Sequence, residues 1–423
     1  MSDAETNSRP DGYIETQVNV DEHSDKGGSG AERWINCPGS SVLLKMLNLP
    51  QTDEPDYRRD GIAAHEVAAH CLNNSIDTWE VVGTKFHDVE VDAPMAEAVQ
   101  VYLDDVRQFF DYPTVMIEQA IGRDLPQQPH KDFWGRLDFG AWGKEDTIIE
   151  DYKHGEGIVV DPVENPQMMY YAYGLILRRQ QINRVEVRSD RIVRLRICQP
   201  RAFHEDGPIR EWETTAGEII HWGENVLIPA MERADFDTSF DTGKHCRFCP
   251  AKLFCPLLAN IYGAAMRADA TAIPNFGQNR LAAEYEAIEA VQYYIKALKD
   301  ETLRRNLVGN TVPGTKLVPK RAIRVFIPSA EVEENGMKVM KPIDDIMRTK
   351  FGEDAFTKPE LKSPAEMEKL GPAAKNFVKS YCYTPNNGLT VAPISDPKPA
   401  VKVEKGVDVF AHLIQNGDAQ SAN

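Results

Sequence analysis

The chain has 423 residues, with 48 Lys and Arg against 65 Asp and Glu, so its formal net charge is −17. This length allows one large domain or two modest ones and excludes a small scaffold held by disulfides. The excess of acid argues against a protein that coats nucleic acid nonspecifically, because phosphate binding depends on Lys and Arg. It does not exclude a nuclease, because carboxylates that hold divalent ions add negative charge.

The first residues lack the basic start and apolar stretch of a secretory signal, and no apolar run is long enough to span a bilayer. We therefore expect a cytoplasmic protein without a membrane partner. In a reducing cytosol the seven cysteines are available to metals and do not form structural disulfides.

Residues 1–28 are polar and acidic and lead into a Gly-Gly-Ser-Gly run at 27–30, which is typical of a disordered leader. From residue 29 to residue 265, helical and strand-like patterns alternate. The patterns predict helices at 61–73, 93–110 and 164–181, and strands at 114–119, 133–142, 147–153 and 184–199. This order predicts an α/β fold class.

Residues 266–390 are predicted to form an added α+β C-terminal region. It begins with a long amphipathic helix at 278–308 and continues with short strands and helices. Residues 391–423 look like a Pro-rich linker and tail. The apolar cluster between Val407 and Ile414 is either a mobile peptide that binds a partner protein or a docked terminal helix.

Acidic and basic side chains meet in the predicted strands. Asp151 and Lys153 alternate with Tyr152 and so share one strand face, and a hairpin with the preceding strand brings Asp138 beside them. Two carboxylates with open coordination positions suit Mg²⁺ or Mn²⁺. Such an ion activates water and neutralises charge on a phosphate, while Lys153 adds positive charge or handles the proton of the attacking water.

Two predicted helices contribute further candidates. His65 is a possible third ligand, which favours Mn²⁺, or else a packed or capping histidine. Gln167 and Tyr171 are four residues apart and share a helix face, from which they reach a substrate backbone, unless Tyr171 only packs on the sheet. Eight arginines between Arg178 and Arg201 predict a local basic stripe, with a solvated strand face as the alternative.

In this order, Gly61 to His65, Asp138, Asp151-Tyr152-Lys153 and Gln167 to Tyr171 resemble the PD-(D/E)XK nuclease superfamily in its RecB-like branch. The resemblance implies a restriction-endonuclease-like core, in which helices flank a central mixed sheet. It also implies a metal-dependent DNA nuclease in which His65, Asp138 and Asp151 bind the metal, Lys153 acts in catalysis with the two acids, and Gln167 and Tyr171 contact DNA.

The sequence departs from this branch at one position. Ala69 stands where the branch often has Glu, four residues after the histidine. Any helper role of that Glu is therefore absent or passes to Glu66 or Glu118.

Three cysteines, Cys246, Cys249 and Cys255, lie within ten residues, and Cys37 is a candidate fourth ligand. Four thiolates suit either a zinc ion or a [4Fe-4S] cluster, and spacing alone does not decide between them. One distant cysteine ahead of the nuclease motifs and three after them resemble the iron-sulfur members of the RecB-like branch, including CRISPR adaptation nucleases and AddB-type repair subunits. This resemblance implies an iron-sulfur cluster that joins both ends of the nuclease domain.

Outer segments at Arg33-Trp34, Cys37-Pro38, Lys316 to Val318 and Glu368 to Leu370 are similar to a family of phage-encoded proteins of the same nuclease class. Together the patterns predict a Mg²⁺- or Mn²⁺-dependent exonuclease that acts on DNA ends or single strands in phage replication or recombination. It would work in the host cytoplasm, where the tail binds other replication proteins. The alternatives are a non-catalytic DNA-binding or assembly protein with a structural iron-sulfur or zinc site, and a zinc-stapled adaptor without a nuclease fold.

Overall fold

A computed structural model describes residues 24–48, 56–267, 277–320, 325–327, 329–334, 337–357, 360–383, 388–393 and 398–401. The chain divides into two compact units, Met1–Tyr294 and Ile295–Asn423. The predicted leader lies outside the described residues up to position 23, but 24–28 pack into the first unit, where Lys26 is fully buried. The predicted tail, with its apolar cluster, lies outside them from position 402.

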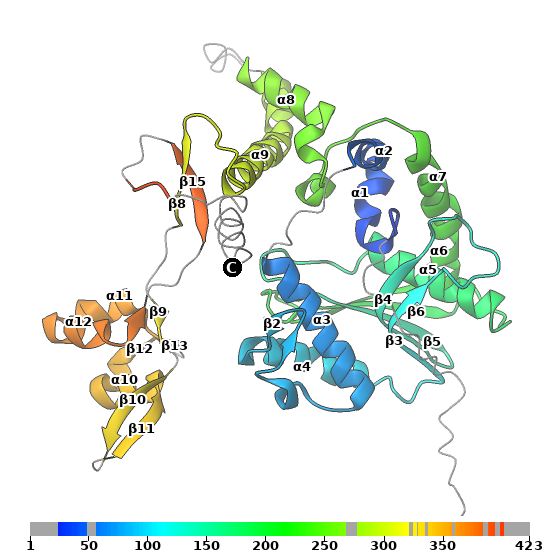
Figure 1. The fold of residues 1–423 in the computed structure, drawn as a ribbon. Coiled ribbons are helices and arrows are strands. Elements are labelled where there is room, and N and C mark those ends of the chain that lie inside the picture. The colour runs from blue at the N-terminus through cyan, green and yellow to red at the C-terminus, as the bar shows by residue number, and fades with distance from the viewer. Residues whose placement is uncertain are drawn as a thin grey trace, which may run out of the picture. The chain divides into compact units, whose positions relative to one another are not determined.

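A five-stranded sheet forms the centre of the first unit (Figure 1). Its strand order is β3-β4-β5-β6-β7, and neighbouring strands are antiparallel except β5 and β6, which are parallel. The strands are β3 (Thr114–Ile121), β4 (Gly135–Trp142), β5 (Asp146–Tyr152), β6 (Ile192–Cys198) and β7 (Ile209–Thr215). The predicted α/β class, with helices flanking a central mixed sheet, is confirmed.

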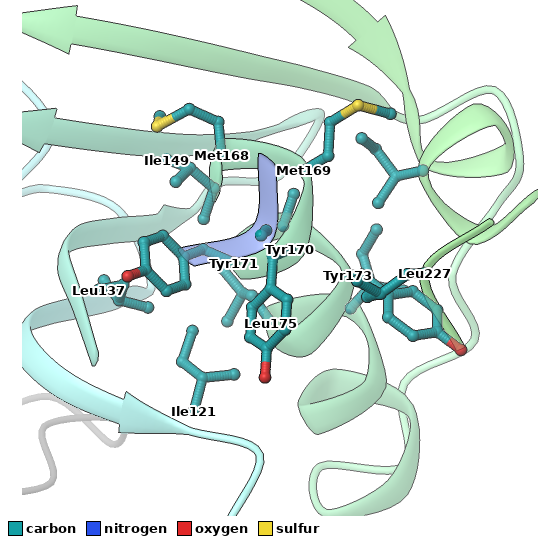
Figure 2. Close-up of a cluster of buried hydrophobic side chains, with 14 of the residues drawn as sticks. Ile121, Leu137, Ile149, Met168, Met169, Tyr170, Tyr171, Tyr173, Leu175 and Leu227 are labelled. Atoms are coloured by element: carbon teal, nitrogen blue, oxygen red, sulfur yellow. The ribbon is translucent and has the colours of Figure 1, made fainter. Parts of the chain in front are cut away.

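Helices cover both faces of this sheet. The first face carries α1 (Ala31–Asn36), α5 (Pro166–Gln181), α6 (Ala216–Trp222) and α7 (Ile228–Phe236). Its buried core includes Trp34 and Leu195, together with Ile149 and Tyr170, which Figure 2 shows. The second face carries α3 (Asp56–Asn74) and α4 (Ala93–Arg107), over a core that includes Val67, Leu103, Phe139 and Tyr152. Because both faces are covered, every residue of β5 after Asp146 is buried.

Local sequence explains where α5 begins. The Asn165 side chain accepts hydrogen bonds from the backbone N–H groups of Gln167 and Met168, at 3.0 and 3.3 Å. Pro166 follows at the first helical position, where its missing N–H has no cost. This cap places Gln167 in the first turn of the helix.

The structure corrects one strand and adds another. The strand predicted from residue 184 begins only at Ile192, because the preceding residues turn: Arg184 has φ of 55°, and Arg188 pairs with Asp190 at 2.6 Å. Strand β7 was not predicted. Its alternate residues include Glu211 and Glu213, so it lacks the apolar pattern of an interior strand.

Shorter elements complete the first unit: η1 (Gly28–Gly30), α2 (Pro38–Leu47), η2 (Thr78–Val81), β1 (Lys85–Phe86), β2 (Val89–Glu90), η3 (Gly223–Leu227), η4 (Lys244–Phe248), η5 (Lys252–Phe254) and α8 (Pro256–Met266). The predicted long helix is α9 (Gln278–Leu307). Its Ala290 packs with Leu258 of α8 and with Cys246 and Cys255. This packing explains why the first unit continues to Tyr294, past the predicted domain end at 265.

The second unit has the predicted α+β character. Its elements are β8 (Thr315–Pro319), β9 (Val325–Phe326), β10 (Ser329–Glu334), β11 (Met337–Pro342), α10 (Ile343–Phe351), η7 (Gly352–Ala355), β12 (Phe356–Thr357), β13 (Glu360–Leu361), α11 (Pro364–Met367), η8 (Glu368–Leu370), α12 (Pro372–Lys379), β14 (Cys382–Tyr383) and β15 (Leu389–Pro393). The strands pair two by two, and Met347 and Val378 are buried in a small core of their own. No helix in the described ranges of either unit is both long and apolar enough to cross a membrane.

Candidate functional site

The candidate site lies where β4 and β5 separate. The two strands pair from Trp142 and Thr147 as far as Phe139 and Glu150. The next residues, Asp138 and Asp151, therefore come immediately after the end of the ladder. There the Asp138 carboxylate accepts a hydrogen bond from the backbone N–H of Tyr152 at 2.8 Å. The strand register thus places both acids at the same end of the sheet.

Glu118 joins the site from the neighbouring strand β3. Its φ of 47° lies in the left-handed region, which a non-glycine residue rarely adopts and which costs about 1 kcal/mol or more. Residues an even number apart on a regular strand share one face. Here Ile117 packs towards α3 and α4 while Ile121 packs into the opposite core, so the alternation is interrupted at Glu118. In this conformation Glu118 Oε1 lies 3.3 Å from His65 Nδ1, and Oε2 lies 2.9 Å from Arg136 Nε.

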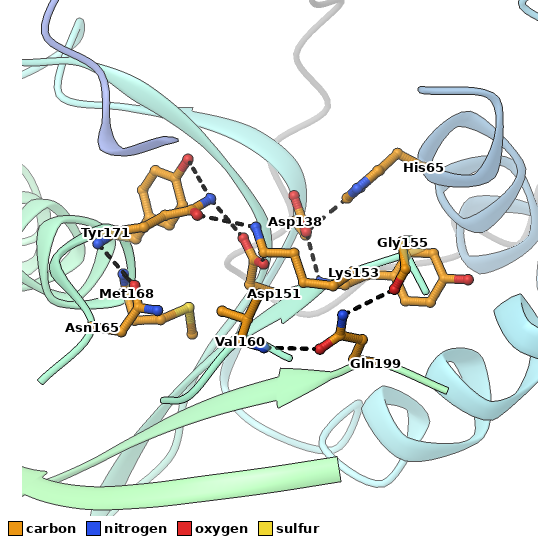
Figure 3. Close-up of polar contacts among 12 residues, drawn as sticks. His65, Asp138, Asp151, Lys153, Gly155, Val160, Asn165, Met168, Tyr171 and Gln199 are labelled. Atoms are coloured by element: carbon orange, nitrogen blue, oxygen red, sulfur yellow. Dashed lines mark hydrogen bonds and ion pairs between the residues drawn. The ribbon is translucent and has the colours of Figure 1, made fainter. Parts of the chain in front are cut away.

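His65 extends from α3 towards Asp138 (Figure 3). Its Nδ1 is 3.5 Å from Asp138 Oδ2, and its ring packs edge-on against Tyr152. Burial lowers the pKa of His65, but the carboxylates of Asp138 and Glu118 outweigh this effect and raise it to about 9. Burial likewise raises the pKa of Asp138 to about 7, against the opposing effect of His65. The negative charge of these carboxylates therefore favours a cation beside them.

His65, Glu118 and Asp138 have the spacing of metal ligands, since each offers one ligand atom and these atoms lie within 4.8 Å of one another. Carboxylate oxygens with one imidazole suit Mg²⁺ or Mn²⁺. A second group within the described part of the chain has the same spacing: His130, Asp132 and Asp235. There, however, the ammonium of Lys26 already lies 2.5 Å from Asp132 and 2.6 Å from Asp235.

Asp151, Lys153 and Gln167 form the adjoining half of the site. Lys153 Nζ lies 2.6 Å from Asp151 Oδ2. The Gln167 side chain donates to Asp151 Oδ1 at 2.8 Å and accepts from Lys153 Nζ at 3.0 Å, and its amide also lies 3.5 Å from the Tyr171 hydroxyl. Burial lowers the pKa of Lys153, but Asp151 and Asp138 raise it overall. Lys153 is therefore held as a charged ammonium beside the acids.

The structure brings all six predicted residues of this site to one end of the sheet. Figure 3 labels His65, Asp138, Asp151, Lys153 and Tyr171, and Gln167 is placed there by its hydrogen bonds to Asp151 and Lys153. The prediction that Asp151 belongs to the ligand group is not confirmed: Glu118 completes that group, while the Asp151 carboxylate pairs with Lys153 and Gln167. Glu66, the other candidate for a helper role, instead lies 3.5 Å from His87. The one signal that pointed to Glu118 was Ala69, which leaves the helper role of a glutamate to another residue.

The predicted basic stripe is wrong for two of its arginines, Arg196 and Arg178. Arg196 pairs with Glu150 at 3.0 Å, with Glu211 at 2.5 Å and with Asp105. Arg178 likewise pairs with Asp124. Acids of neighbouring elements thus neutralise these guanidinium groups, and Arg196 fastens α4 to the sheet.

The four predicted cysteine ligands also lie together. Cys37, at the start of α2, lines one pocket with Cys246, Cys249 and Cys255, and all four are buried free thiols. Gly39 allows this approach, because a side chain there would meet the backbone oxygen of Ser239 at 2.6 Å. The chain ends of the predicted nuclease domain therefore meet at the cysteine pocket.

Positive charge surrounds the cysteine pocket. Hydrogen bonds to Cys246 and Cys37 raise the pKa of His245 to about 10. The largely buried guanidinium of Arg33 interacts with Cys249 and Cys37 and donates to Ser40 Oγ at 2.8 Å. Such cations favour thiolates over thiols, and the pKa of Cys37 is lowered, but burial raises the pKa of Cys249 and Cys255.

One solved structure, described as "Crystal structure of SSO0001", is similar over 52% of this chain and 94% of that chain, with 12% identity and a TM-score of 0.23. At this score the similarity carries no argument about fold or function. The family model described as "Protein of unknown function (DUF2800)" matches residues 23–399. This match extends through both units of the structure. The chain therefore belongs to the DUF2800 family.

Proposed function

We propose that the chain is a Mg²⁺- or Mn²⁺-dependent deoxyribonuclease, a RecB-like member of the PD-(D/E)XK superfamily. One observation carries the proposal: His65 from α3, Asp138 from β4 and Asp151 from β5 gather at one end of the sheet with the Lys153 ammonium beside them. These residues are far apart in the sequence, and core packing does not require acids at this place. Such a set suits metal-assisted hydrolysis of a phosphodiester.

The residues fit a divalent ion. His65, Asp138 and Glu118 offer the ligand atoms, and Asp151 lies next to them. A bound ion would activate water and neutralise charge on the phosphate. Burial among like charges makes an added cation favourable at Asp138.

The chain's own groups have distinct roles around that ion. The Lys153 ammonium, 2.6 Å from Asp151, offsets negative charge that develops on the phosphate. Gln167 positions Lys153 and Asp151 together. Tyr171 places a hydroxyl beside Gln167 for contact with the substrate backbone.

We propose DNA ends or single strands as the substrate, and an exonuclease in phage replication or recombination, acting in the host cytoplasm. The resemblance to RecB-like nucleases supports this assignment. Since acids neutralise Arg196 and Arg178, the contacts with DNA are expected from Gln167, Tyr171 and Lys153 and not from the arginine stripe. The binding of replication proteins by the tail remains a prediction.

We also propose that the cysteine pocket holds a [4Fe-4S] cluster, with zinc as the alternative. A single tetrahedral zinc ion would bring its four sulfur atoms to about 3.8 Å from one another. In the described part of the chain, neither of the two three-ligand groups within 4.8 Å contains a cysteine. The wider thiol arrangement fits a polynuclear cluster better than a single zinc ion, whereas the nearby cations suit either anionic site.

Anaerobic purification followed by incubation with end-labelled DNA tests the proposal. We expect a brown protein that degrades DNA with Mn²⁺ or Mg²⁺ and is inactive without either ion. A protein that leaves single-stranded and duplex DNA intact in every metal would contradict the nuclease assignment and favour a DNA-binding or assembly role. A colourless protein with one bound zinc ion would contradict the cluster.

Two matched variants of glutamate sharpen this test. Glu118→Ala removes a member of the ligand group, so cleavage should fall by about 100-fold or more. Glu66→Ala removes a carboxylate one residue from His65, but that carboxylate contacts His87, so cleavage should stay within about twofold. Equal losses in both variants would remove Glu118 from the proposed ligand set.

A further inference from the structure

The segment around Lys26 has no role in the proposed chemistry, although it is fixed more firmly than its position near the chain start suggests. Lys26 is fully buried, and its ammonium lies 2.5 Å from Asp132 and 2.6 Å from Asp235. Asp132 belongs to the connection before β4, and Asp235 belongs to α7. A buried ammonium is tolerated only with such partners, so the segment is anchored at this position.

Two further hydrogen bonds fix the backbone beside Lys26. Ser24 Oγ donates to the carbonyl of Asp132 at 2.7 Å, and the indole N–H of Trp34 donates to the carbonyl of Gly27 at 3.2 Å. Trp34 is itself fully buried in the core. The next residue, Gly28, therefore has little freedom to move.

Gly28 lies directly against Tyr171. A Cβ atom on Gly28 would be 2.9 Å from Cε1 of the Tyr171 ring and 3.3 Å from Tyr170. Gly135 of β4 lies beside Gly28, since a Cβ atom on Gly135 would be 3.1 Å from the same Cε1 and 3.6 Å from the backbone nitrogen of Gly28. Figure 2 shows the blue N-terminal ribbon passing beside the rings of Tyr170 and Tyr171. We call the place where Gly28 and Gly135 together contact this edge of the Tyr171 ring the tyrosine slot.

The tyrosine slot connects to the candidate site through one side chain. Tyr171 is 4% exposed, and its hydroxyl lies 3.5 Å from the Gln167 amide, which binds Asp151 and contacts Lys153. A shift of the ring would therefore change the position of Gln167. Both glycines are required for close approach, since a methyl group at either would force the ring to move.

We propose that Lys26 and Gly28 are positioning residues, which fix Tyr171 and thereby set Gln167, Asp151 and Lys153 for substrate. This inference rests on the proposed nuclease function. The segment with Lys26 and Gly28 would thus affect catalysis although it offers no metal ligand and does not contact the reacting atoms.

Gly28→Ala tests the inference, with Gly27→Ala as the matched control. A Cβ atom on Gly27 would meet its neighbours at 3.4 Å or more, and its φ of −70° suits any residue. Well below the melting temperature, Gly28→Ala should lower kcat by about tenfold, because small misplacements at a catalytic site are costly. Gly27→Ala should stay within about twofold.

A double-mutant cycle with Tyr171→Ala gives a readout that does not depend on cleavage. Gly28→Ala should lower the melting temperature by about 3 °C in the wild type and by much less without the ring. Equal shifts in both backgrounds would overturn the contact, and full kcat in Gly28→Ala would overturn its positioning role. If the wild type cleaves no DNA, the proposed function fails, and the cycle still decides whether Gly28 fixes Tyr171.

Discussion

The candidate active site and the cysteine pocket both gather residues from distant parts of the chain, but they are built differently. The active site depends on strand register, and its own side chains connect it, as when Gln167 joins Asp151 to Lys153. The cysteine pocket takes its thiols from the start of α2 and from the turns around η4 and η5. A site on strands is preformed without its ion, whereas a site on turns needs its metal to connect the pieces.

The largest expected effect is the loss of DNA cleavage in variants of the active site. Asp151→Ala and Lys153→Ala should each lower DNA cleavage at least about 1000-fold, because Lys153 offsets charge on the reacting phosphate and Asp151 holds that ammonium in place. Each variant breaks an ion pair in which Asp151 is 2% exposed, so the melting temperature should fall by about 5 °C, less than for loss of a cysteine ligand. Cleavage rates and thermal unfolding of the same preparations check this. Wild-type rates in either variant would exclude that residue from the mechanism.

The cysteine pocket should behave in the opposite way. Cys249→Ala removes one ligand of the proposed cluster, so it should lose bound iron and visible colour and melt about 10 °C lower. Cys71→Ala is the matched control, since Cys71 is a buried free thiol of the α3 core far from the pocket in sequence. Unchanged iron content and melting temperature in Cys249→Ala would contradict the ligand assignment.

The group of His130, Asp132 and Asp235 has the same ligand spacing as the active site, but the ammonium of Lys26 lies beside its acids. Lys26→Met leaves Asp132 and Asp235 without their buried partner and should cost about 3 kcal/mol of unfolding free energy at pH 7. Chemical denaturation measures this loss. A loss below about 1 kcal/mol would show that the anchor is dispensable.

The same variant has a predicted pH dependence. Burial raises the pKa of Asp235, but its hydrogen bond and charge interaction with Lys26 lower it overall below the ordinary 3.8, with His130 and Lys131 contributing. A lowered folded pKa stabilises the protein above pH 3.8 and loses that effect as pH falls through the folded pKa. The stability difference between wild type and Lys26→Met should therefore shrink below about pH 4. A difference that grows with acid would contradict the assignment.

The smallest expected effect is on the stability of the active site without its ion. Chelation of Mg²⁺ or Mn²⁺ by EDTA should stop cleavage reversibly while the melting temperature changes by about 1 °C or less. The hydrogen bonds of Gln167 and of Asp138 hold the site together in that state. A drop as large as that expected from loss of the cysteine ligand would show that the strand site also depends on its metal.

Sequence patterns identified the parts of the fold that have strong periodicity. Helices α3, α4 and α5 and strands β3 to β5 lie where apolar spacing predicted them. Strand β7 was missed because tertiary pairing places charged residues such as Glu211 on a strand. The start of β6 at Ile192 was missed because the residues before it turn. Likewise no local pattern shows that Arg196 is neutralised by acids from α4 and β7.

The candidate site was predictable as a set of residues but not as a geometry. The residues from His65 to Tyr171 carry a recognisable order, and the structure brings them together. The place of Glu118 depends on a left-handed backbone residue in β3, which sequence periodicity does not reveal. The proposed role of Gly28 depends on its contact with Tyr171, which is more than a hundred residues away in the sequence, so no local pattern indicates it.

Titration of the metal-free protein with Mn²⁺, followed by electron paramagnetic resonance, tests the central claim most directly. The wild type should bind one Mn²⁺ ion with nitrogen coupling from His65, and Asp138→Ala should lose that binding. Asp132→Asn, in the second group with the same spacing, should keep it. Binding that survives Asp138→Ala, or that disappears in Asp132→Asn, would contradict a metal site at the end of β4 and β5.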